Sequence, residues 1–471
     1  MDAAVINCTN PSIGQVEYLK YLQAMRAVQK PSFMLVEMEL PAIDVTAVGK
    51  TVALFLNRHE SLRTVFPLVG DEIRQVVLPA TDERFQLQYV NATQVDDQGF
   101  SSIRQMHFDN AAAAFADIET GPLTRMLMFR RSDGYVFSLL IHHIICDEWS
   151  RGIAGQELIT IYQSFLSDSQ PELPPLTVTL KDYCEQQNKW LSQNKQELSA
   201  FWRRKLQDFD TLFDIADYHR AYARRTNLTL PDAAAGSGYE DAELAAILDK
   251  PDASAYTSIL SGELFAEVKS MAAGNKSTIS AFIYAGFFLL LHAYTGKRRL
   301  LVPALIADRY QPEYQQLIGC LLGAIYLAVS IDERHSVNDF IAELNADIID
   351  VIMNGRLIFS HNYLGLDGNR LRNCCDMYIN YFSKPTDLPA DEYIIGEHEN
   401  VDAIHYPIYA MAIEYNDALV IIWKYNKYLF DPAMIEDMVM YYREILQAMV
   451  SRADKTIREA FDSRRPVAHT L

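Results

Sequence analysis

The chain has 471 residues, more than one hydrophobic core usually serves, so two domains or lobes are expected. Hydrophobic residues make up 49% and charged residues 22%, which is typical of a soluble globular protein. The formal net charge of -19 argues against nucleic-acid binding, which needs a basic surface, and disfavours an anionic membrane as a partner.

The chain begins without a basic segment followed by an apolar one, so no secretory signal is predicted. Its most apolar stretch, Ile279 to Leu291, has the length of a buried core helix and is too short for a membrane span. The six cysteines show no CxxC pair or metal-ligand spacing. These features predict a cytoplasmic protein with free thiols, no metal site and no membrane partner.

Hydrophobic periodicity predicts a mixed order of helices and strands, without the regular alternation of a doubly wound sheet. The predicted helices are 12–22, 43–57, 101–115, 150–165, 180–206, 278–294, 337–351 and 432–449. The predicted strands are 33–40, 73–78, 85–90, 123–129, 135–143, 258–264 (running into a helix), 300–306 and 377–382, with hairpin turns at 132–134 and 416–417. Proline-rich 171–175 is the predicted link between lobes at 1–175 and 176–471, and 227–254 is an expected surface excursion.

Two adjacent histidines, His142 and His143, end the apolar strand that begins at Tyr135. Because neighbouring strand residues point to opposite faces, one imidazole is expected in the core and the other across the sheet edge. A buried histidine pair is more often structural than catalytic, so the functional case depends on the rest of the chain. Imidazole titrates near neutral pH, which suits His143 for exchanging a proton with an amine or a hydroxyl.

Asp147 follows where the strand gives way to a helix, and a buried carboxylate there needs a cationic partner. Arg58, Arg63 and Arg309 are the candidates, because each lies at the end of an apolar segment. The chain has no GxSxG, HExxH or Walker A pattern. A covalent acyl-enzyme is therefore unsupported, and direct transfer guided by a histidine is favoured.

Residues 142–150, His-His-Ile-Ile-Cys-Asp-Glu-Trp-Ser, resemble the HHxxxDGxS signature of non-ribosomal peptide synthetase condensation domains, within the HHxxxD acyltransferase superfamily. Residues 58–66, Arg-His-Glu-Ser-Leu-Arg-Thr-Val-Phe, match the family motif RHExLRTxF at every specified position. Four more segments resemble family motifs in the family's order: 12–18 with Gln15, 181–184 with Tyr183, 317–322 and 376–381. The resemblance covers nearly the whole chain.

The resemblance implies a mixed α/β fold of two chloramphenicol-acetyltransferase-like lobes, in a V-shaped pseudo-dimer with a tunnel between them. Donor acyl groups would arrive on the phosphopantetheine arm of a carrier protein, so this chain would bind no cofactor of its own. The implied catalytic residue is His143, with His142 and Asp147 mainly structural. The implied partner of Asp147 is Arg309, and Arg63 fits this role less well. Arg58 is kept as a supporting residue of the site.

The resemblance also suggests residues that line the tunnel or contact substrate: Glu148, Trp149, Ser150, Gly323 and Asn380. Three departures from the family pattern bear on acceptor recognition. Glu148 stands where glycine is usual, Gly323-Ala324 replaces Asn-Thr, and the HQxxPFE motif is barely visible near 361–363. Glu148 either narrows the acceptor route or attracts an amine, or it is an ordinary glutamate at a helix start, favoured by the helix dipole.

The leading prediction is a condensation enzyme of non-ribosomal peptide or hybrid polyketide biosynthesis. It would form an amide, or as second choice an ester, between a carrier-bound acyl group and a soluble amine or alcohol or a second carrier. The alternatives are a CoA-dependent O-acyltransferase and a catalytically inert recruitment module. We expect a free-standing monomer. Two basic groups are candidate carrier-docking patches or, alternatively, ordinary solvated helix faces: Arg203, Arg204 and Lys205, and Arg220, Arg224 and Arg225.

Overall fold

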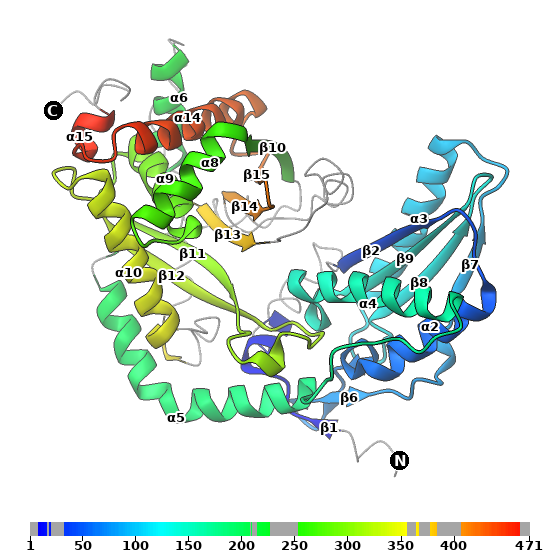
Figure 1. Ribbon diagram of the computed structural model, residues 1–471. Helices are drawn as coiled ribbons and strands as arrows, with labels where there is room; N and C mark the ends of the chain where they lie inside the picture. Colours follow the sequence, from blue (N-terminus) through cyan, green and yellow to red (C-terminus); the bar gives the residue numbers. More distant parts are fainter. Residues whose placement is uncertain are drawn as a thin grey trace. The chain divides into compact units, whose positions relative to one another are not determined.

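The computed structural model describes residues 8–16, 18–19, 33–207, 209, 214–226, 253–355, 364–366, 377–383 and 407–461, with the side chain of Arg224 excluded (Figure 1). Backbone contacts divide the chain into two compact units, Met1–Asn194 with Ala307–Leu322, and Lys195–Ile306 with Gly323–Leu471. The division falls inside helix α5 (Leu180–Leu206), not at the proline-rich segment 171–175. A short segment, 307–322, also belongs to the first unit although its sequence neighbours belong to the second.

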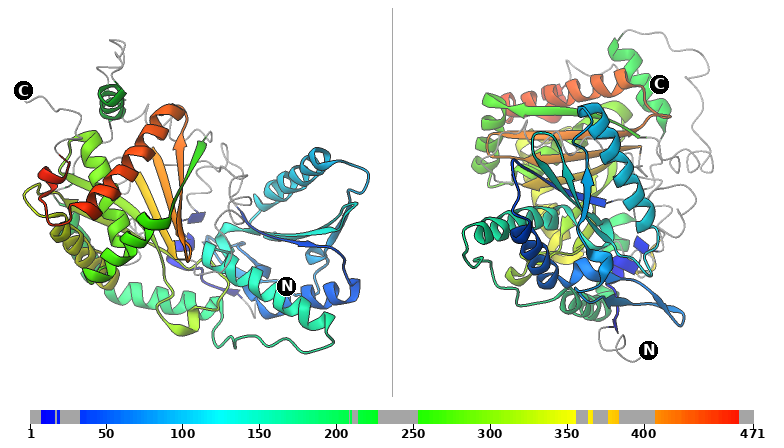
Figure 2. Two further views of the ribbon diagram at one scale, coloured as in Figure 1. Left: turned by 45° about the horizontal axis from the view of Figure 1, so that its top comes forward. Right: turned by 90° about the vertical axis from the view of Figure 1, so that its right-hand side faces the viewer.

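A four-stranded sheet in the order β2-β9-β8-β7 forms the centre of the first unit. β9 (Tyr135–His142) pairs antiparallel with β2 (Phe33–Leu40) and with β8 (Thr124–Arg130), whose other neighbour is the parallel β7 (Gln88–Asn91). The predicted hairpin at 132–134 is therefore confirmed. β9 is buried at nearly every position, because helix α3 (Asp97–Phe115) lies on one face of the sheet and α4 (Glu148–Leu166) on the other (Figures 1 and 2).

Aspartate side chains begin the helices of this unit. Asp44 accepts the backbone N–H of Ala47 at the start of α2 (Val45–Arg58), and Asp96 does the same for Gly99 at the start of α3. Such caps satisfy backbone donors that a helix leaves unpaired. The remaining short elements are β1 (Cys8–Thr9), η2 (Glu60–Arg63), β3 (Thr64–Val65), β4 (Leu68–Val69), β5 (Glu72–Ile73), β6 (Gln75–Val77), η3 (Glu83–Phe85), η4 (His143–Ile145) and η6 (Pro312–Tyr314).

The second unit is built on a six-stranded sheet in the order β10-β15-β14-β13-β11-β12. Its strands are β10 (Ala253–Ser261), β11 (Arg299–Ala307), β12 (Leu322–Ser330), β13 (Met377–Ser383), β14 (Ile408–Glu414) and β15 (Ala418–Asn426). Its helices, besides the second part of α5, are α6 (Ile215–Thr226), α8 (Gly262–Gly274), α9 (Ile279–Thr295), α10 (Val337–Gly355), α14 (Pro432–Ser451) and α15 (Ile457–Phe461). The predicted hairpin at 416–417 and the predicted strand that runs into a helix near 258–264 are confirmed.

Helix α9 shows how an apolar sequence becomes a core helix. It begins with a Thr278 cap on the N–H of Ala281 and ends at Gly296, whose φ of 70° is a left-handed conformation that glycine adopts without strain. Almost every residue between these ends is buried. Among the described residues no single helix is long and apolar enough to cross a membrane, although α8 and α9, bent by 109° at their junction, pass that test together. The predictions for 227–252 and 361–363, and the prediction of free thiols at Cys374 and Cys375, lie outside the described residues.

The RHExLRTxF segment contributes Arg58 and His59 to a largely buried polar triad with Glu157 in the first unit. Glu157 of α4 accepts from Arg58 Nε at 2.9 Å and lies 2.7 Å from His59 Nε2, and its side chain is about 5% exposed. Arg58 also donates to the carbonyl of Pro174. Burial raises the pKa of Glu157, but the hydrogen bonds from His59 and Arg58 outweigh it and hold the pKa below its ordinary value. The triad therefore joins the end of α2 to the middle of α4.

Replacing Glu157 by leucine should lower the free energy of unfolding by about 3 kcal/mol, because the half-buried Arg58 loses its counter-charge and the buried His59 loses its hydrogen-bond partner. Urea unfolding of the whole chain measures the change. The matched control is Glu72→Ala, which breaks an ion pair with Arg74 on a side chain that is 70% exposed, and we expect it to cost under about 1 kcal/mol. Equal losses for the two variants would contradict the buried role of Glu157.

Candidate active site

The two histidines of the motif lie on either side of the end of a strand. His142 is the last residue of β9 and is fully buried, whereas His143 begins the 3-10 turn η4 and is half-buried. The predicted contrast between a core histidine and a more exposed one is therefore present. It arises because the chain leaves the strand between the two residues, and not from strand alternation alone.

His142 holds the turn that carries His143. Its Nδ1 accepts the backbone N–H of Ile144 at 2.9 Å, which assigns the ring proton to Nε2. Among the described residues Nε2 has no hydrogen-bond partner, and the ring meets Phe115 nearly edge-on at a centroid distance of 5.9 Å. Burial, and then the neighbouring His143, lower the pKa of His142 to about 3. His142 is therefore neutral near pH 7 and caps the turn as a fixed acceptor.

His143 offers one nitrogen to its surroundings. Its Nδ1 is buried and has no hydrogen-bond partner among the described residues, so the ring presents Nε2. The ring of Tyr18 lies against the imidazole with a centroid distance of 6.0 Å and an interplanar angle of 53°. No carboxylate in the described part of the chain accepts from Nδ1, so a Ser-His-Asp type of relay is not assembled at His143.

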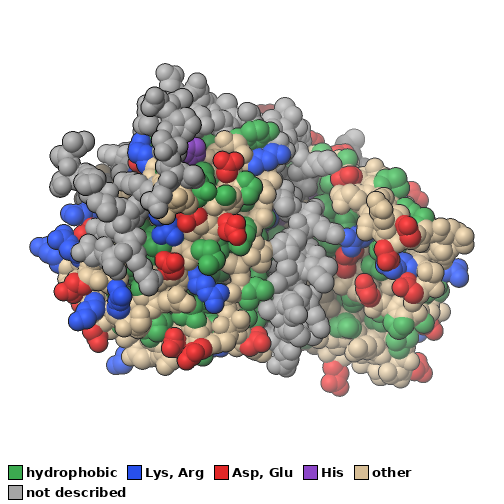
Figure 3. Space-filling view, turned by 90° about the horizontal axis from the view of Figure 1, so that it is seen from above, with side chains coloured by type: hydrophobic (Ala, Val, Ile, Leu, Met, Phe, Trp, Pro, Cys, Tyr) green, Lys and Arg blue, Asp and Glu red, His purple; other side chains and the backbone are tan. Residues whose placement is uncertain are grey.

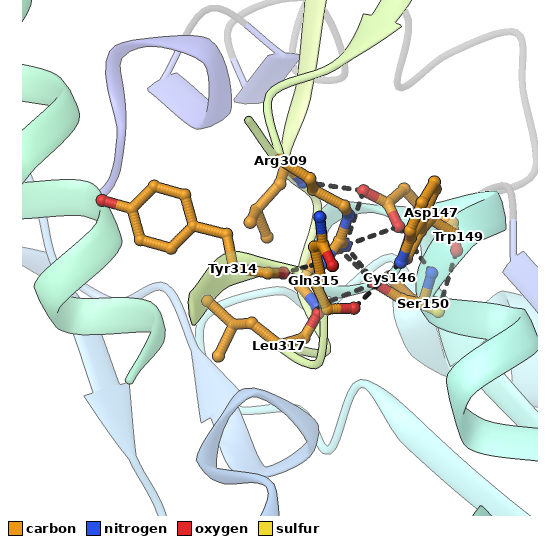
Figure 4. A network of polar contacts seen from close by, with 10 residues as sticks. Cys146, Asp147, Trp149, Ser150, Arg309, Tyr314, Gln315 and Leu317 are labelled. Carbon is orange, nitrogen blue, oxygen red and sulfur yellow. Dashed lines mark hydrogen bonds and ion pairs between the residues drawn. The ribbon is translucent and has the colours of Figure 1, made fainter. Parts of the chain in front are cut away.

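Asp147 is the centre of the polar network drawn in Figure 4. Its carboxylate is fully buried and accepts from Arg309 Nη2 at 2.9 and 3.1 Å, from the Ser150 N–H at 2.8 Å and from the Leu321 N–H at 3.0 Å. Arg309 Nη1 donates to the carbonyls of Tyr314 and Leu317, both at 2.7 Å. With its oxygens fully engaged, Asp147 caps α4 and holds the 307–322 segment.

Arg309, the arginine that the resemblance implied for Asp147, is the one that contacts it. Arg309 makes the contact, while Arg63 donates instead to the carbonyls of Leu56 and Leu78 within its own part of the first unit. Arg58 pairs with Glu157. Arg63 and Arg58 thus support the unit at other places and do not reach the carboxylate of Asp147.

Ser150 joins the same segment through its hydroxyl. Oγ donates to the carbonyl of Gly319 at 2.8 Å and accepts from the Gly319 N–H at 3.0 Å and from Arg309 at 2.8 Å, which uses its whole hydrogen-bonding capacity. A Cβ at Gly319 would lie 2.6 Å from Leu321 and 2.8 Å from Leu180. Any larger residue here would force both leucine side chains to move, so close packing favours glycine at this position of the motif.

Trp149 and Glu148 occupy the first turn of α4. The Trp149 ring is about half exposed, its indole N–H donates to the carbonyl of Gln315 at 3.0 Å, and the guanidinium carbon of Arg309 lies 5.9 Å from the ring centroid. Glu148 accepts from Arg151 with both oxygens, the shortest contact being 2.6 Å. The carboxylate that replaces the family glycine is thus locally neutralised, and it also lies at the favourable end of the helix dipole.

Gly323 and Asn380 belong to the second unit. Gly323 is the buried second residue of β12. Asn380 is buried in β13, where its carbonyl oxygen accepts the Leu305 N–H at 2.9 Å and its amide donates to the Tyr409 hydroxyl at 2.7 Å. These bonds account for the amide of Asn380 within the sheet, and substrate contact by either residue remains a prediction.

Two further buried groups belong to this region, and sequence reasoning did not assign them to the site. The Tyr183 hydroxyl donates to Asp308 at 3.1 Å, and Gln15 donates to the carbonyl of Ile144. Burial and the nearby Asp308 raise the pKa of Tyr183 well above its ordinary value, so it acts as a neutral donor. Membership in motif-like segments was the only sequence signal for either residue.

Among the described side chains, three of the six residues in the two predicted basic patches are paired with acidic residues of the second unit. Lys205 contacts Asp347 and Asp350, Arg220 contacts Asp217, and Arg225 contacts Asp437 at 2.9 Å. On the face drawn in Figure 3, acidic and basic side chains are interspersed over the described surface. Among the described residues no three His, Cys, Asp or Glu side chains are grouped so that they could hold a metal ion.

Comparison with known proteins establishes the family. A model of the condensation domain matches residues 20–462. The chain belongs to the condensation-domain family. A linear gramicidin synthase of Brevibacillus parabrevis is 25% identical over 424 residues, which are 88% of this chain and 8% of that protein. Bacitracin synthase 1 of Bacillus licheniformis is 23% identical over 474 residues, which are 98% of this chain and 8% of that protein. The chain thus spans less than a tenth of the length of these relatives.

Solved structures confirm the mixed α/β fold of condensation domains. The condensation domain of the monacolin K polyketide synthase MokA matches with a TM-score of 0.75 at 13% identity, over 96% of this chain and 99% of that one. The X-domain from teicoplanin biosynthesis, solved in complex with OxyB, matches with a TM-score of 0.70 at 16% identity, over 98% and 96%. At these identities the likeness concerns the fold.

Replacing His142 by asparagine should reduce the acid sensitivity of the fold. Between the unfolded pKa near 6.5 and the folded value of about 3, only the unfolded chain binds a proton, so stability falls as the pH drops through this range. From pH 7 to pH 5 the contribution of His142 is a loss of about 2 kcal/mol. Asparagine can still accept the Ile144 N–H but does not titrate.

Urea unfolding of both proteins at the two pH values measures this difference. The pH-dependent loss should be smaller in His142→Asn by about 2 kcal/mol. His142→Phe, which removes both the titration and the cap, should show the same reduced pH dependence at a lower overall stability. An unchanged pH dependence in both variants would show that His142 is not buried as a neutral ring.

Proposed function

We propose that this chain is a condensation enzyme that transfers an acyl or aminoacyl group from a carrier-protein phosphopantetheine thioester to an amine, forming an amide. Membership of the condensation-domain family gives the general class, a transferase of non-ribosomal peptide and hybrid polyketide assembly lines. The observation that carries the specific proposal is the turn of His143. Its backbone is held by His142 and Gln15, while the imidazole itself presents Nε2.

The proposed reaction needs no covalent enzyme intermediate. The amine nitrogen attacks the thioester carbonyl carbon and forms a tetrahedral oxyanion. Collapse of this intermediate forms the amide, breaks the carbon–sulfur bond and releases the pantetheine thiol, which takes up the proton that the amine loses. The acyl carrier, its pantetheine arm and the amine are substrates, and the chain supplies orientation and hydrogen bonding.

The geometry of His143 favours a hydrogen-bond donor over a strong base. Nδ1 is buried without an acceptor in the described part of the chain, so a proton placed there would be left unpaired. A buried N–H without a partner is costly, which favours the tautomer with the proton on Nε2. In that form Nε2–H donates to the developing oxyanion, the contribution that a preformed donor makes to acyl transfer.

Replacing His143 by alanine should lower kcat by about a hundredfold or more, because the donor to the oxyanion is lost. Glutamine at this position keeps a side-chain N–H of similar reach, so His143→Gln should retain roughly tenfold more activity than the alanine variant. Single-turnover measurements with a loaded carrier and a saturating amine compare the two. Equal inactivity of both variants would favour general-base work, and near-wild-type activity of His143→Ala would overturn any chemical role.

The function itself is tested by intact-protein mass spectrometry of loaded carrier proteins. The chain is offered matched acyl groups on a carrier and on CoA, each with a panel of amines and alcohols, and His143→Ala is run in parallel to subtract spontaneous hydrolysis. Loss of acyl mass from the carrier with formation of an amide supports the proposal. Formation of an ester would show instead that the acceptor is a hydroxyl group.

The two alternatives have distinct outcomes in the same experiment. Transfer from acyl-CoA but not from the carrier would identify a CoA-dependent O-acyltransferase. No transfer from any donor would favour a recruitment module. The X-domain that was solved in complex with OxyB has a similar fold, and the likeness is limited to the fold. The buried network around Asp147 and the presented Nε2 of His143 favour the enzyme over the recruitment module.

A further inference from the structure

A buried amide, Gln15, lies against the turn that carries His143. Its side chain is about 3% exposed, and its oxygen accepts the backbone N–H of Ser12 at 2.9 Å. The same oxygen accepts from Gln75 at 3.3 Å and from the Cys184 thiol at 3.5 Å. Three donors fix the orientation of the amide, so the nitrogen of Gln15 must point in the other direction.

That nitrogen donates to the carbonyl of Ile144 at 3.3 Å. The N–H of the same residue donates to His142, and the carbonyl of His143 accepts the Cys146 N–H at 3.3 Å. The peptide groups that follow His143 are thus held from two sides, by an imidazole from the strand and by an amide from the N-terminal segment. Each fixes a backbone group one residue away from the reactive side chain.

The same N-terminal segment reaches the imidazole itself. Ile13–Val16 and Tyr18–Leu19 are helical, and Tyr18 stands three positions after Gln15, on the neighbouring face of one turn. Its ring lies 6.0 Å from that of His143. Asn188 of α5 anchors the segment by accepting the Ile13 N–H at 3.0 Å and donating to the Pro11 carbonyl at 2.9 Å. The N-terminal segment therefore reaches both the backbone next to His143 and the ring of His143.

We propose that Gln15 and Tyr18 are positioning residues for His143: Gln15 fixes the turn through the Ile144 carbonyl, and Tyr18 fixes the imidazole so that Nε2 faces the reacting carbonyl. This inference rests on the proposed function and deepens it. The Asp147 network holds the start of α4, whereas the Gln15 and Tyr18 pair acts directly on the residue at the reacting centre.

The test compares Gln15→Met with Gln75→Met. Methionine matches the volume of glutamine but removes the bond to Ile144. Gln75 belongs to the same buried amide cluster, where it donates to Gln15, to the Asn10 carbonyl and to Cys184. Within the described structure it makes no bond to the His143 turn, and its replacement leaves Gln15 held by Ser12 and Cys184 with its own bond to the Ile144 carbonyl intact. In single-turnover and steady-state assays, Gln15→Met should lower kcat by roughly tenfold with little change in KM for the loaded carrier, because misplacing a reacting group affects the chemical step.

Tyr18 gives a second, independent pair of variants outside the amide cluster. Tyr18→Leu removes the ring and should lower kcat by a similar factor, while Tyr18→Phe restores the ring and should recover most of that loss. The histidine signals in long-range ¹H–¹⁵N spectra supply the structural readout, with His143 assigned by its absence in His143→Gln. Both Gln15→Met and Tyr18→Leu should shift the His143 signals, with those of His292 in the second unit as an internal reference.

The proposal is overturned if kcat and the melting temperature decrease equally in Gln15→Met and Gln75→Met while the chemical shifts of His143 do not change. That pattern would indicate that both substitutions only destabilise the fold. The proposal is also overturned if Gln15→Met keeps full kcat. Should Gln15→Met not fold, the Tyr18 pair still decides, because failure of phenylalanine to recover activity over leucine contradicts positioning by the ring. If the wild-type chain transfers no acyl group, the proposed function fails, and the ¹H–¹⁵N spectra alone still show whether Gln15 and Tyr18 set the imidazole.

Discussion

The buried ion pair between Asp147 and Arg309 is the interaction on which the rest of the site depends. Removing two charges from water costs free energy that mutual attraction seldom repays, so the pair must be compensated by further hydrogen bonds. That condition is met, because Asp147 also accepts two backbone N–H groups and Arg309 also donates to two backbone carbonyls. All of these backbone groups lie at the start of α4 or in segment 307–322. The ion pair therefore fixes the start of α4 and the position of segment 307–322. It contributes more to the placement of these two segments than to the free energy of unfolding.

The turn η4, which carries His143, is also held by buried hydrogen-bonding groups. A 3-10 turn of three residues has few internal hydrogen bonds and depends on outside partners for its shape. His142 provides an acceptor that cannot titrate near neutral pH, and Gln15 provides a donor whose orientation is fixed by three bonds to its oxygen. His143 is thus a partly exposed ring on a backbone held by buried groups. This arrangement suits a side chain that must present one nitrogen repeatedly in one direction, which is how a preorganised donor contributes to catalysis.

The local sequence pattern was sufficient to predict the helices and strands, but not the long-range contacts between their side chains. The apolar run to His142, the turn at 132–134 and the helix 180–206 follow directly from periodicity and turn residues, and the structure has them at nearly the predicted bounds. Arg58, Arg63 and Arg309 all end apolar segments, so periodicity gave no means of choosing between them, and the partner of Asp147 lies 162 residues away. The predicted boundary at 175–176 rests on a proline-rich stretch that resembles a linker, whereas backbone contacts divide the chain within helix α5, which contains no proline or glycine. The predicted strand at 85–90 begins instead as η3, where the Asp82 side chain accepts the Arg84 N–H and starts a turn.

The replacement of the family glycine by Glu148 now has a physical description. A carboxylate in the first turn of a helix is stabilised by the unpaired N–H groups there, and Arg151 neutralises it one turn later. Its side chain is about 16% exposed, so little of the charge is presented to solvent. The amine-attracting role that the sequence allowed would need this charge to be unpaired, and the ion pair argues against it. The glutamate adds the volume of its own side chain beside the motif. It also holds the side chain of Arg151 in a defined position through their ion pair. The opposite charges of Glu148 and Arg151 cancel, so the pair adds no net charge to this turn. Any effect on the choice of acceptor then follows from the shape of the two side chains.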